Sequence, residues 1–257
     1  MKICKLCQLP KESLENSHII PDAFWRKVKG AAQGKKNGLY ISLEKSKNQY
    51  GQDTHTEELL CWDCEQKLSV NLENYAAKLC LQNPSNIGIT IAKQEKSRIL
   101  SGINYEKLKL FQLSVLWRAS VSTKSIYSSI KLIPAEEERI RQALYELKPL
   151  REHEYGCIMS ILWINKDHKT TRDSKAFMIS PYAHSAGQHN FFVFVFGGFE
   201  WRFSNPSCSN NSIDEQRVIT KQGSMICQLK DIHSDPVLFE AIFNAYKNQK
   251  EGRGIDV

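Results

Sequence analysis

The sequence predicts an α+β fold, in which a small zinc module at the N-terminus precedes a helical segment and an antiparallel sheet with a C-terminal helix. Three features support this prediction. Two Cys-x-x-Cys pairs lie within the first 64 residues, apolar residues recur at helical spacing as far as Pro149, and aromatic and β-branched residues dominate the segments beyond it. We therefore expect a zinc module over residues 1–83 and a helix-plus-sheet region over residues 84–257.

Length and composition favour a folded chain in a reducing compartment. The 257 residues are 41% hydrophobic, which is enough for a sizeable core. The net charge of +7 is a mild cationic bias, consistent with nucleic acid or another polyanion but compatible with an ordinary soluble protein. Four of the eight cysteines pair at zinc spacing and the others are scattered, so we expect a cytoplasmic protein. No signal-peptide core and no run near ~18 apolar residues occurs, so no membrane segment is expected.

The first predicted element is a pair of cysteine clips, Cys4 with Cys7 and Cys61 with Cys64. Four thiolates complete a tetrahedral zinc site and leave no open position for water, so this zinc would be structural. Because the two clips are far apart in the sequence, metal binding would fold the chain between them. The alternatives at this spacing are two unrelated pairs or redox thiols.

Local patterns predict the other parts of the zinc module. Residues 1–10 indicate a zinc knuckle, and the Ile-rich segment around His18 indicates a short strand that ends in a turn. Lys27–Tyr50 is rich in Lys, Gly, Ser and Asn and is expected to form a flexible basic hairpin or loop. Apolar residues recur at helical spacing from Leu68 to Leu79, so the second clip opens a helix. A knuckle, a hairpin and a helix that carries the second ligand pair form the layout of a treble-clef zinc module.

The later region is expected to contain three more helices and several strands. Residues 105–122 are apolar almost all round, which predicts a largely buried helix. Pro134, followed closely by three glutamates, opens another helix, and Asp235 is the expected N-cap of a last one. The expected strands lie at residues 155–164, 176–179, 190–203 and 223–229, with Gly197-Gly198 as a tight turn or bulge. Residues 86–103 have no strong pattern and are compatible with a strand and a connection, and residues 252–257 are expected to fray.

The order of the N-terminal motifs resembles that of the HNH endonucleases: Cys-x-x-Cys, then Ser17-His18-Ile19-Ile20-Pro21, then Leu59-Leu60-Cys61-x-x-Cys64-Glu65-Gln66. The resemblance covers about the first eighty residues. It implies a ββα-metal fold in which His18 is the general base and a divalent ion, Mg²⁺ or Mn²⁺, stabilises the scissile phosphate. The chemistry is consistent with this, because phosphodiester hydrolysis needs a base near pH 7 and a cation that offsets charge on the phosphate.

Three positions depart from the family's pattern. Ser17 stands where many members have Asp, Thr56 with its neighbour His55 stands where members often have Asn, and Glu65 stands where they commonly have His or Asn. Glu65 offers oxygen ligands that suit Mg²⁺ or Mn²⁺, so it is the first candidate for the divalent ion. Further candidates for the same groove are Glu73, Asn71, Glu15 and Asn16.

Structural roles are the alternatives for these residues. His18 could instead cap the hairpin or serve as a zinc ligand, and Glu65 could be a solvated residue favoured by the helix dipole. Arg118 lies inside the helix that is expected to be buried, where an unpaired guanidinium would be costly. We therefore expect Arg118 to have a partner carboxylate or to reach out to phosphate.

The basic loop supplies the candidate contacts to nucleic acid. Lys35, Lys36, Lys45 and Lys47 could follow a phosphate backbone and add affinity that does not depend on base sequence. The alternative is a solvated surface loop.

The sequence thus favours a metal-dependent endonuclease that acts on DNA rather than RNA. One alternative is a non-catalytic, zinc-stabilised module that binds nucleic acid or protein. Another is an effector in which the region after residue 83 senses a ligand or protein and controls the nuclease. The resemblance suggests a bacterial or phage-related role, including defence, and it leaves a protein activator and the oligomeric state open.

Overall fold

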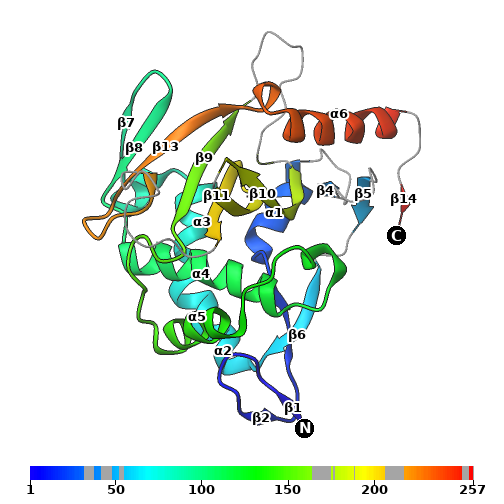
Figure 1. Ribbon diagram of the computed structural model, residues 1–257, viewed down its shortest axis with the longest axis vertical. Coiled ribbons are helices and arrows are strands. Elements are labelled where there is room, and N and C mark those ends of the chain that lie inside the picture. Colours follow the sequence, from blue (N-terminus) through cyan, green and yellow to red (C-terminus); the bar gives the residue numbers. More distant parts are fainter. Residues whose placement is uncertain are drawn as a thin grey trace.

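The computed structural model describes residues 1–31, 38–41, 48–51, 55–163, 175, 177–187, 189–205, 217–250 and 255–256. Over these residues the chain is an α+β protein with one large mixed sheet, which confirms the α+β part of the prediction (Figure 1). The N-terminal knuckle lies at one end of the molecule, away from helix α6 (Figure 1). Within the described residues, no helix combines the length and the apolar character that crossing a membrane requires.

Short strands and a long interrupted helix make up the N-terminal region. Strand β1 (Lys2–Ile3) pairs with β2 (Pro10–Lys11), and β3 (Glu15–His18) pairs antiparallel with β6 (Thr56–Leu60). Helix α1 (Asp22–Ala31) was not predicted. The helix predicted after the second clip is confirmed, and it consists of α2 (Trp62–Leu68), a π-helical turn (Ser69–Glu73) and α3 (Asn74–Leu81).

The large sheet has the order β14-β5-β4-β10-β11-β12-β9-β13-β8-β7. Its strands are β4 (Gly38–Ile41), β5 (Asn48–Gly51), β7 (Thr90–Lys93), β8 (Ser97–Ser101), β9 (Cys157–Trp163), β10 (Phe177–Ala186), β11 (His189–Phe196), β12 (Phe199–Asn205), β13 (Ser224–Asp231) and β14 (Ile255–Asp256). Strands β7 and β8 lie within residues 86–103, where a strand was compatible with the sequence. Residues 255–256 were expected to fray but pair with β5 as β14.

The prediction of an antiparallel sheet was wrong, because three strand pairs are parallel: β10 with β4, β13 with β9, and β14 with β5. Strand β4 comes from the segment predicted as a basic hairpin or loop, and it does form a hairpin with β5. This hairpin extends the sheet built by the later region, so strands far apart in the sequence lie side by side. Periodicity along each strand does not encode such long-range pairing.

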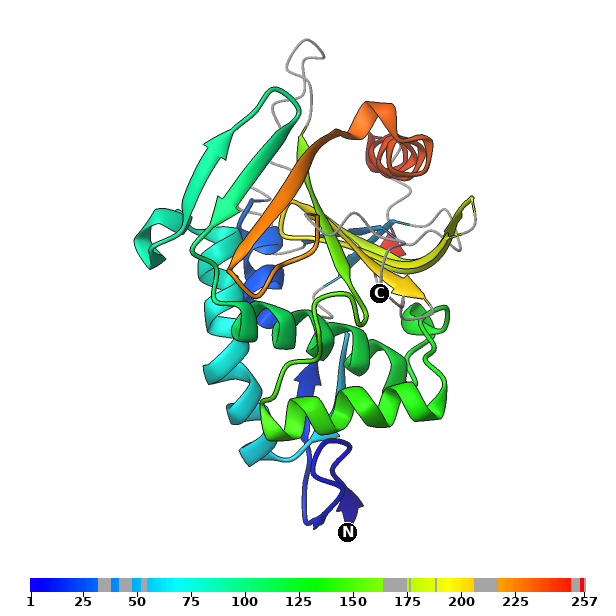
Figure 2. The same cartoon turned by 60° about the vertical axis from the view of Figure 1, so that its left-hand side comes forward.

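Helices cover both faces of the sheet (Figure 2). Helices α4 (Tyr105–Val121) and α5 (Pro134–Glu146) lie on one side and α6 (Pro236–Lys250) on the other (Figure 2). Strand β11 explains the division, since successive side chains of a strand point to opposite faces. Phe192, Phe194 and Phe196 belong to the main core with α4, whereas Val193 and Val195 pack in a second cluster with α6.

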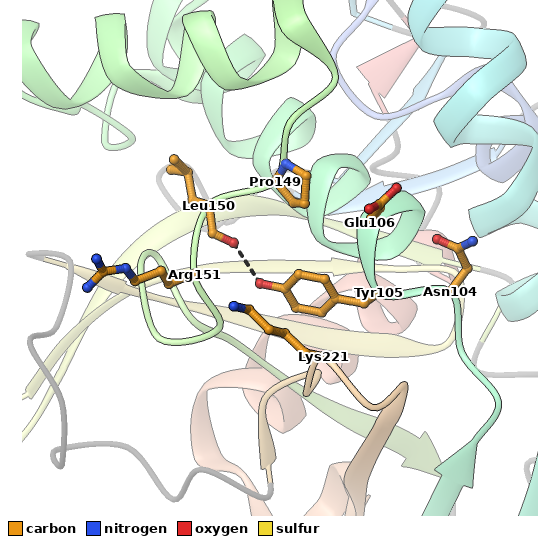
Figure 3. Close-up of a pocket in the computed structure, with 7 residues that line it drawn as sticks. All are labelled: Asn104, Tyr105, Glu106, Pro149, Leu150, Arg151 and Lys221. Atoms are coloured by element: carbon orange, nitrogen blue, oxygen red, sulfur yellow. Dashed lines mark hydrogen bonds between the residues drawn. The ribbon is translucent and has the colours of Figure 1, made fainter.

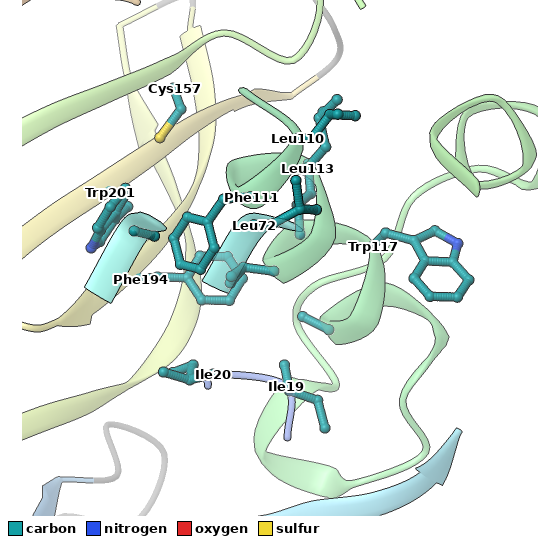
Figure 4. Close-up of a cluster of buried hydrophobic side chains, with 14 of the residues drawn as sticks. Ile19, Ile20, Leu72, Leu110, Phe111, Leu113, Trp117, Cys157, Phe194 and Trp201 are labelled. Atoms are coloured by element: carbon teal, nitrogen blue, oxygen red, sulfur yellow. The ribbon is translucent and has the colours of Figure 1, made fainter. Parts of the chain in front are cut away.

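Helix α4 is the centre of the main core, as its apolar sequence predicts. Fourteen of its residues are buried, and Leu72, Phe111, Phe194 and Trp201 share one cluster with Ile19 and Ile20 (Figure 4). This cluster holds residues from both sides of residue 83, so the two predicted regions share buried surface. The division at residue 83 stays a prediction.

Two cations are buried in α4, Lys109 and Arg118, and each is fully buried. The ammonium of Lys109 donates to the backbone carbonyls of Glu152, Glu154 and Tyr155 at 3.1, 2.6 and 3.3 Å. Burial lowers the pKa of Lys109 to about 8, because an ammonium loses its hydration inside the core. Lys109 therefore fixes the segment that follows α5, whereas Arg118 points to the N-terminal region.

Glycine at position 197 fixes how α1 meets the sheet. Gly197 has a φ of +66° in the turn between β11 and β12, and a Cβ there would lie 2.7 Å from the ring of Phe24. The Phe24 ring also packs edge-on against Phe196, with centroids 4.9 Å apart. The predicted tight turn is thus confirmed, and it lets α1 pack directly against the sheet.

Candidate metal centre and catalytic site

The four cysteines of the two clips converge on one point. The sulfur atoms of Cys4, Cys7, Cys61 and Cys64 all lie within 4.8 Å of one another, and the Cys7 and Cys61 sulfurs are 4.0 Å apart. An ideal zinc tetrahedron with Zn–S bonds of about 2.3 Å has sulfur atoms roughly 3.8 Å apart. The cluster can therefore hold a metal ion, and its donor set is the one that structural zinc takes.

Hydrogen bonds already favour negative charge on one sulfur of this thiol cluster. The pKa of Cys4 is lowered to about 4, first by the Cys64 thiol and then by backbone amides, including that of Cys61 at 3.3 Å. The same interaction raises the pKa of Cys64, whose proton is held between the two sulfurs. Four crowded sulfurs cannot all ionise alone, so a cation is needed to bring all four into the thiolate form.

His18 lies at the end of β3, opposite Thr56 on β6. Its side chain is 26% exposed, so the imidazole stays accessible to water although Ile19 and Ile20 beside it are buried. The carboxylate of Asp22 lies 3.8 Å from Nε2 of His18. The strand therefore fixes the residue while its ring faces a partly open surface.

Ser17 and Glu65 lie against each other beside His18. Glu65 follows Cys64 in the first turn of α2, and Ser17 is fully buried on β3. The Ser17 hydroxyl donates to Oε2 of Glu65 at 2.8 Å. Two of the three positions that depart from the HNH pattern are thus direct neighbours, although 48 residues separate them.

Arg118 joins the same polar cluster from α4. Its Nη1 donates to the backbone carbonyl of His18 at 2.8 Å and lies 2.6 Å from the Glu73 carboxylate. The expectation that Arg118 has a partner carboxylate is confirmed. Glu73 belongs to the π-helical turn after α2, so Glu65 and Glu73 both approach Arg118 from one continuous helical segment.

Burial and the neighbouring carboxylates shift the pKa of His18 in opposite directions. Burial lowers its pKa below the ordinary value of 6.5, and the positive charge of Arg118 adds to this effect. The carboxylates of Asp22, Glu65 and Glu73 oppose it, but the net shift is downward. The imidazole is therefore neutral at pH 7, which is the form that a general base needs. We call Ser17, His18, Glu65, Glu73 and Arg118 the His18 cluster.

The other residues that were predicted to be functional do not belong to the His18 cluster. Asn71 is exposed and its amide donates to the backbone carbonyl of Lys67. His55 is buried against the rings of Trp25 and Tyr40, at centroid distances of 5.6 and 4.7 Å. The four lysines proposed to contact nucleic acid, Lys35, Lys36, Lys45 and Lys47, lie outside the described residues.

Sequence reasoning missed Asp22 and the contact made by Ser17. An acid four residues after the signature histidine was available as a signal for Asp22, because Asp22 opens α1 and this turn brings it back to His18. No sequence signal pointed to the Ser17–Glu65 hydrogen bond, since serine was considered only as a departure from the family's Asp. Within the described residues, the thiol cluster is the one group of three or more His, Cys, Asp or Glu side chains that is close enough to hold a metal ion by itself.

A separate recess of about 500 Å³ lies at the N-terminal end of α4 (Figure 3). Its wall includes Tyr105, whose hydroxyl donates to the backbone carbonyl of Leu150 at 2.6 Å (Figure 3). Arg118 lies thirteen residues further along α4, which corresponds to about 20 Å of helix. None of the residues predicted to be functional lines this recess.

Comparison with protein-family models, with curated proteins and with solved structures finds no match to this chain.

Proposed function

We propose that this protein is a metal-dependent endonuclease of the HNH type that hydrolyses phosphodiester bonds in DNA. The observation that carries the proposal is the hydrogen bond between Ser17 of β3 and Glu65 of α2, with His18 next to Ser17 on the strand and Cys64 of the thiol cluster next to Glu65. The β3–β6 pair followed by α2 is the arrangement that we assign to the ββα-metal, treble-clef module, with zinc as its structural ion.

His18 is the proposed general base. It is neutral at pH 7, partly exposed, and held at the end of a paired strand, so it can accept a proton from a water that attacks the phosphorus atom. Asp22 lies close enough to His18 to stabilise the imidazolium that forms. Arg118 and the two glutamates set the charge around this ring.

Glu65 is the residue that would hold the divalent ion, with the Ser17 hydroxyl beside it. The donor set fits Mg²⁺ or Mn²⁺, since such ions are commonly bound by one or two carboxylates and complete their shell with water and substrate phosphate. When bound, the ion supplies positive charge that stabilises the pentacoordinate phosphate and the leaving oxygen. Glu73 is less suited, because its carboxylate is paired with Arg118.

DNA is the proposed substrate, and the basic loop is the proposed grip on its backbone. Neutralising Lys35, Lys36, Lys45 and Lys47 together should lower the slope of log affinity against log salt by up to ~3–4, at roughly 0.9 per phosphate contact. An unchanged slope would remove the loop from the binding site. We place the protein in the cytoplasm of a bacterium or in a phage-related setting, where it could act in defence with or without a protein activator.

Plasmid cleavage by the wild type and by His18→Ala tests the proposal. Both proteins are assayed with Mg²⁺, with Mn²⁺ and with EDTA, after their zinc content and folding have been checked. We expect cleavage only by the wild type and only with added divalent ion. Cleavage that persists in His18→Ala would remove His18 from the role of base.

A non-catalytic binding module is the second candidate, and one observation favours it. The carboxylates of Glu65 and Glu73 already have partners within the protein, Ser17 and Arg118. If neither protein cuts DNA while both bind it equally, the zinc module is a binder or requires an activator.

A further inference from the structure

The His18 cluster contains a cation that the proposed chemistry does not use. Arg118 lies on α4, outside the segment that resembles the HNH endonucleases, and none of its side chain is exposed. A substrate phosphate therefore cannot reach its guanidinium in this conformation. Its role must be exerted through the protein groups that it contacts.

Those contacts join three elements at one point. A single guanidinium nitrogen, Nη1, donates to the His18 carbonyl at 2.8 Å and lies 2.6 Å from the Glu73 carboxylate. The negative charge of Glu65 also stabilises the charged guanidinium. The carbonyl that accepts is the last of strand β3, immediately before the chain turns toward α1. Holding this carbonyl fixes the peptide plane after His18, and with it the direction in which the imidazole leaves the backbone.

Stability alone is a poor reason for an arginine here. The neighbouring positions of α4 are filled by buried apolar side chains such as Leu116, Trp117 and Ala119. A buried ion pair can often be replaced by apolar residues of similar volume with no loss of stability. The length of the arginine side chain, however, places Nη1 between the end of β3 and the π-helical turn, whereas Nε and Nη2 are buried and make no hydrogen bond with the described residues. A lysine side chain is shorter and would place its ammonium differently.

We infer that Arg118 is a positioning residue, which holds His18 in one orientation by binding the His18 carbonyl and the Glu73 carboxylate together. Through Arg118, the region after residue 83 supplies part of the catalytic site. The inference about turnover rests on the proposed nuclease function, whereas the inference about orientation can be tested without it.

The test compares Arg118→Lys with Lys109→Met in the full-length, zinc-loaded protein. Arg118→Lys keeps the buried charge but moves the donor away from the position of Nη1, because the lysine side chain is shorter. Lys109→Met removes the other buried cation of α4, which contacts the backbone carbonyls of residues 152, 154 and 155 and not that of His18. It therefore serves as the control for the loss of a buried cation that does not contact His18. All measurements are made at a temperature at which circular dichroism and zinc content show each variant to be folded.

Orientation is read by NMR. His18-Ile19 is the one His-Ile pair in the sequence, so labelling with ¹³C-carbonyl histidine and ¹⁵N isoleucine gives a single cross-peak from the peptide that Arg118 binds. We expect this cross-peak to shift or broaden in Arg118→Lys and to stay in place in Lys109→Met. A cross-peak that does not move in Arg118→Lys overturns the inference.

Turnover is read as a separate quantity. We expect kcat of Arg118→Lys to fall roughly 10- to 100-fold with KM unchanged, because a displacement of about 1 Å at a catalytic group can cost that much. Lys109→Met should keep the kcat of the wild type. A shifted cross-peak with an unchanged kcat would reduce Arg118 to a structural contact.

Two further results separate the inference from the proposed function. If the wild type cuts no DNA but the cross-peak shifts only in Arg118→Lys, the nuclease proposal fails and the orienting contact stands. If Arg118→Lys does not fold, Glu73→Gln replaces it. That variant keeps a neutral acceptor for Arg118, so the cross-peak should move in the same direction by a smaller amount, and a cross-peak identical to the wild type would overturn the inference.

Discussion

The thiol cluster and the His18 cluster adjoin each other at Cys64 and Glu65, yet they balance charge in opposite ways. Within the described residues, the four sulfurs are bonded to one another and to backbone amides, and the charges of Lys11 and Arg141 also act on Cys7. Two side-chain cations do not balance four thiolates, so the rest of the negative charge must be met by an ion from outside. In the His18 cluster the protein supplies the balancing groups itself. Arg118 is paired with Glu73, and the Ser17 hydroxyl is bound to Glu65.

This difference separates the roles of the two metals. Zinc removal should act on folding, because the ion would be the strongest link between the two cysteine-bearing segments, which otherwise meet through single contacts such as the hydrogen bond from the Lys5 amide to the Leu59 carbonyl at 2.9 Å. Removal of Mg²⁺ or Mn²⁺ should act on catalysis alone, because the His18 cluster is held by hydrogen bonds and an ion pair without it. Single substitutions can separate the role of zinc in folding from the role of Mg²⁺ or Mn²⁺ in catalysis.

Cys61→Ser should have the largest effect. Loss of one thiolate opens the tetrahedron, and structural zinc in small modules is worth about 10–16 kcal/mol of apparent binding free energy. We expect the variant to lose its zinc and to unfold over the N-terminal region, as measured by elemental analysis and thermal unfolding.

Cys80→Ala is the matched control for this loss. Cys80 is also buried but lies outside the thiol cluster, so its substitution should cost only ~1–2 kcal/mol and leave one zinc per chain. Unchanged zinc content and thermal stability in Cys61→Ser would show that the cysteines are not a structural zinc site.

Glu73→Ala should give the next largest loss of stability, because it removes the carboxylate in contact with the buried guanidinium of Arg118 and leaves Glu65 as a counter-charge without a direct contact. Removing one partner of a buried pair costs about 3–5 kcal/mol, and Glu73 is only 14% exposed. The double variant Glu73→Leu with Arg118→Met should recover most of this loss, since no charge remains to be buried. Urea unfolding of the zinc-loaded proteins measures both. A loss below ~1 kcal/mol in Glu73→Ala would mean that water, not Glu73, balances Arg118.

The part of the site that the sequence predicts is the part encoded by short, regular spacing. The two Cys-x-x-Cys clips show directly that four sulfur ligands are available, and the apolar periodicity after Cys64 predicts a helix. Both features were predicted and both are present. The buried helix α4 and the N-cap Asp235, which accepts from the Leu238 amide at 3.0 Å, were found for the same reason.

What the sequence did not reveal depends on contacts between distant segments. Arg118 meets His18 across 100 residues, and the parallel pairing of β4 with β10 joins a basic N-terminal hairpin to the late sheet. Helix α1 was not predicted, because it has only ten residues and its buried apolar face, Phe24, Trp25 and Val28, is too short to give a clear periodic pattern. Neither propensity nor periodicity specifies which distant element a side chain will reach.

Ser17→Ala should lower the free energy of unfolding less than Cys61→Ser or Glu73→Ala does. The variant removes the hydroxyl that donates to Glu65, but Glu65 is only half-buried and water can replace the donor, so we expect a cost of about 1 kcal/mol. Ser13→Ala is the control, since Ser13 is exposed and its loss should stay within ~0.5 kcal/mol. Urea unfolding gives both values, and zinc content should be unchanged in both. Loss of zinc in Ser17→Ala would mean that the two clusters are not independent.

The protonation of His18 should change the free energy of unfolding least. Its pKa in the folded protein is lowered, mainly by burial, so the NMR midpoint of its ring protons should lie below 6.5. The unfolded chain then binds the proton more readily than the folded one, so folding free energy from this group is constant above pH 6.5 and is lost as the pH falls through the folded pKa. Asp22 opposes the shift, and Asp22→Asn should therefore lower the midpoint further. A midpoint at or above 6.5 in the wild type, measured without added divalent ion, would mean that the carboxylates outweigh burial and that His18 is partly charged near neutral pH, where a base must be neutral.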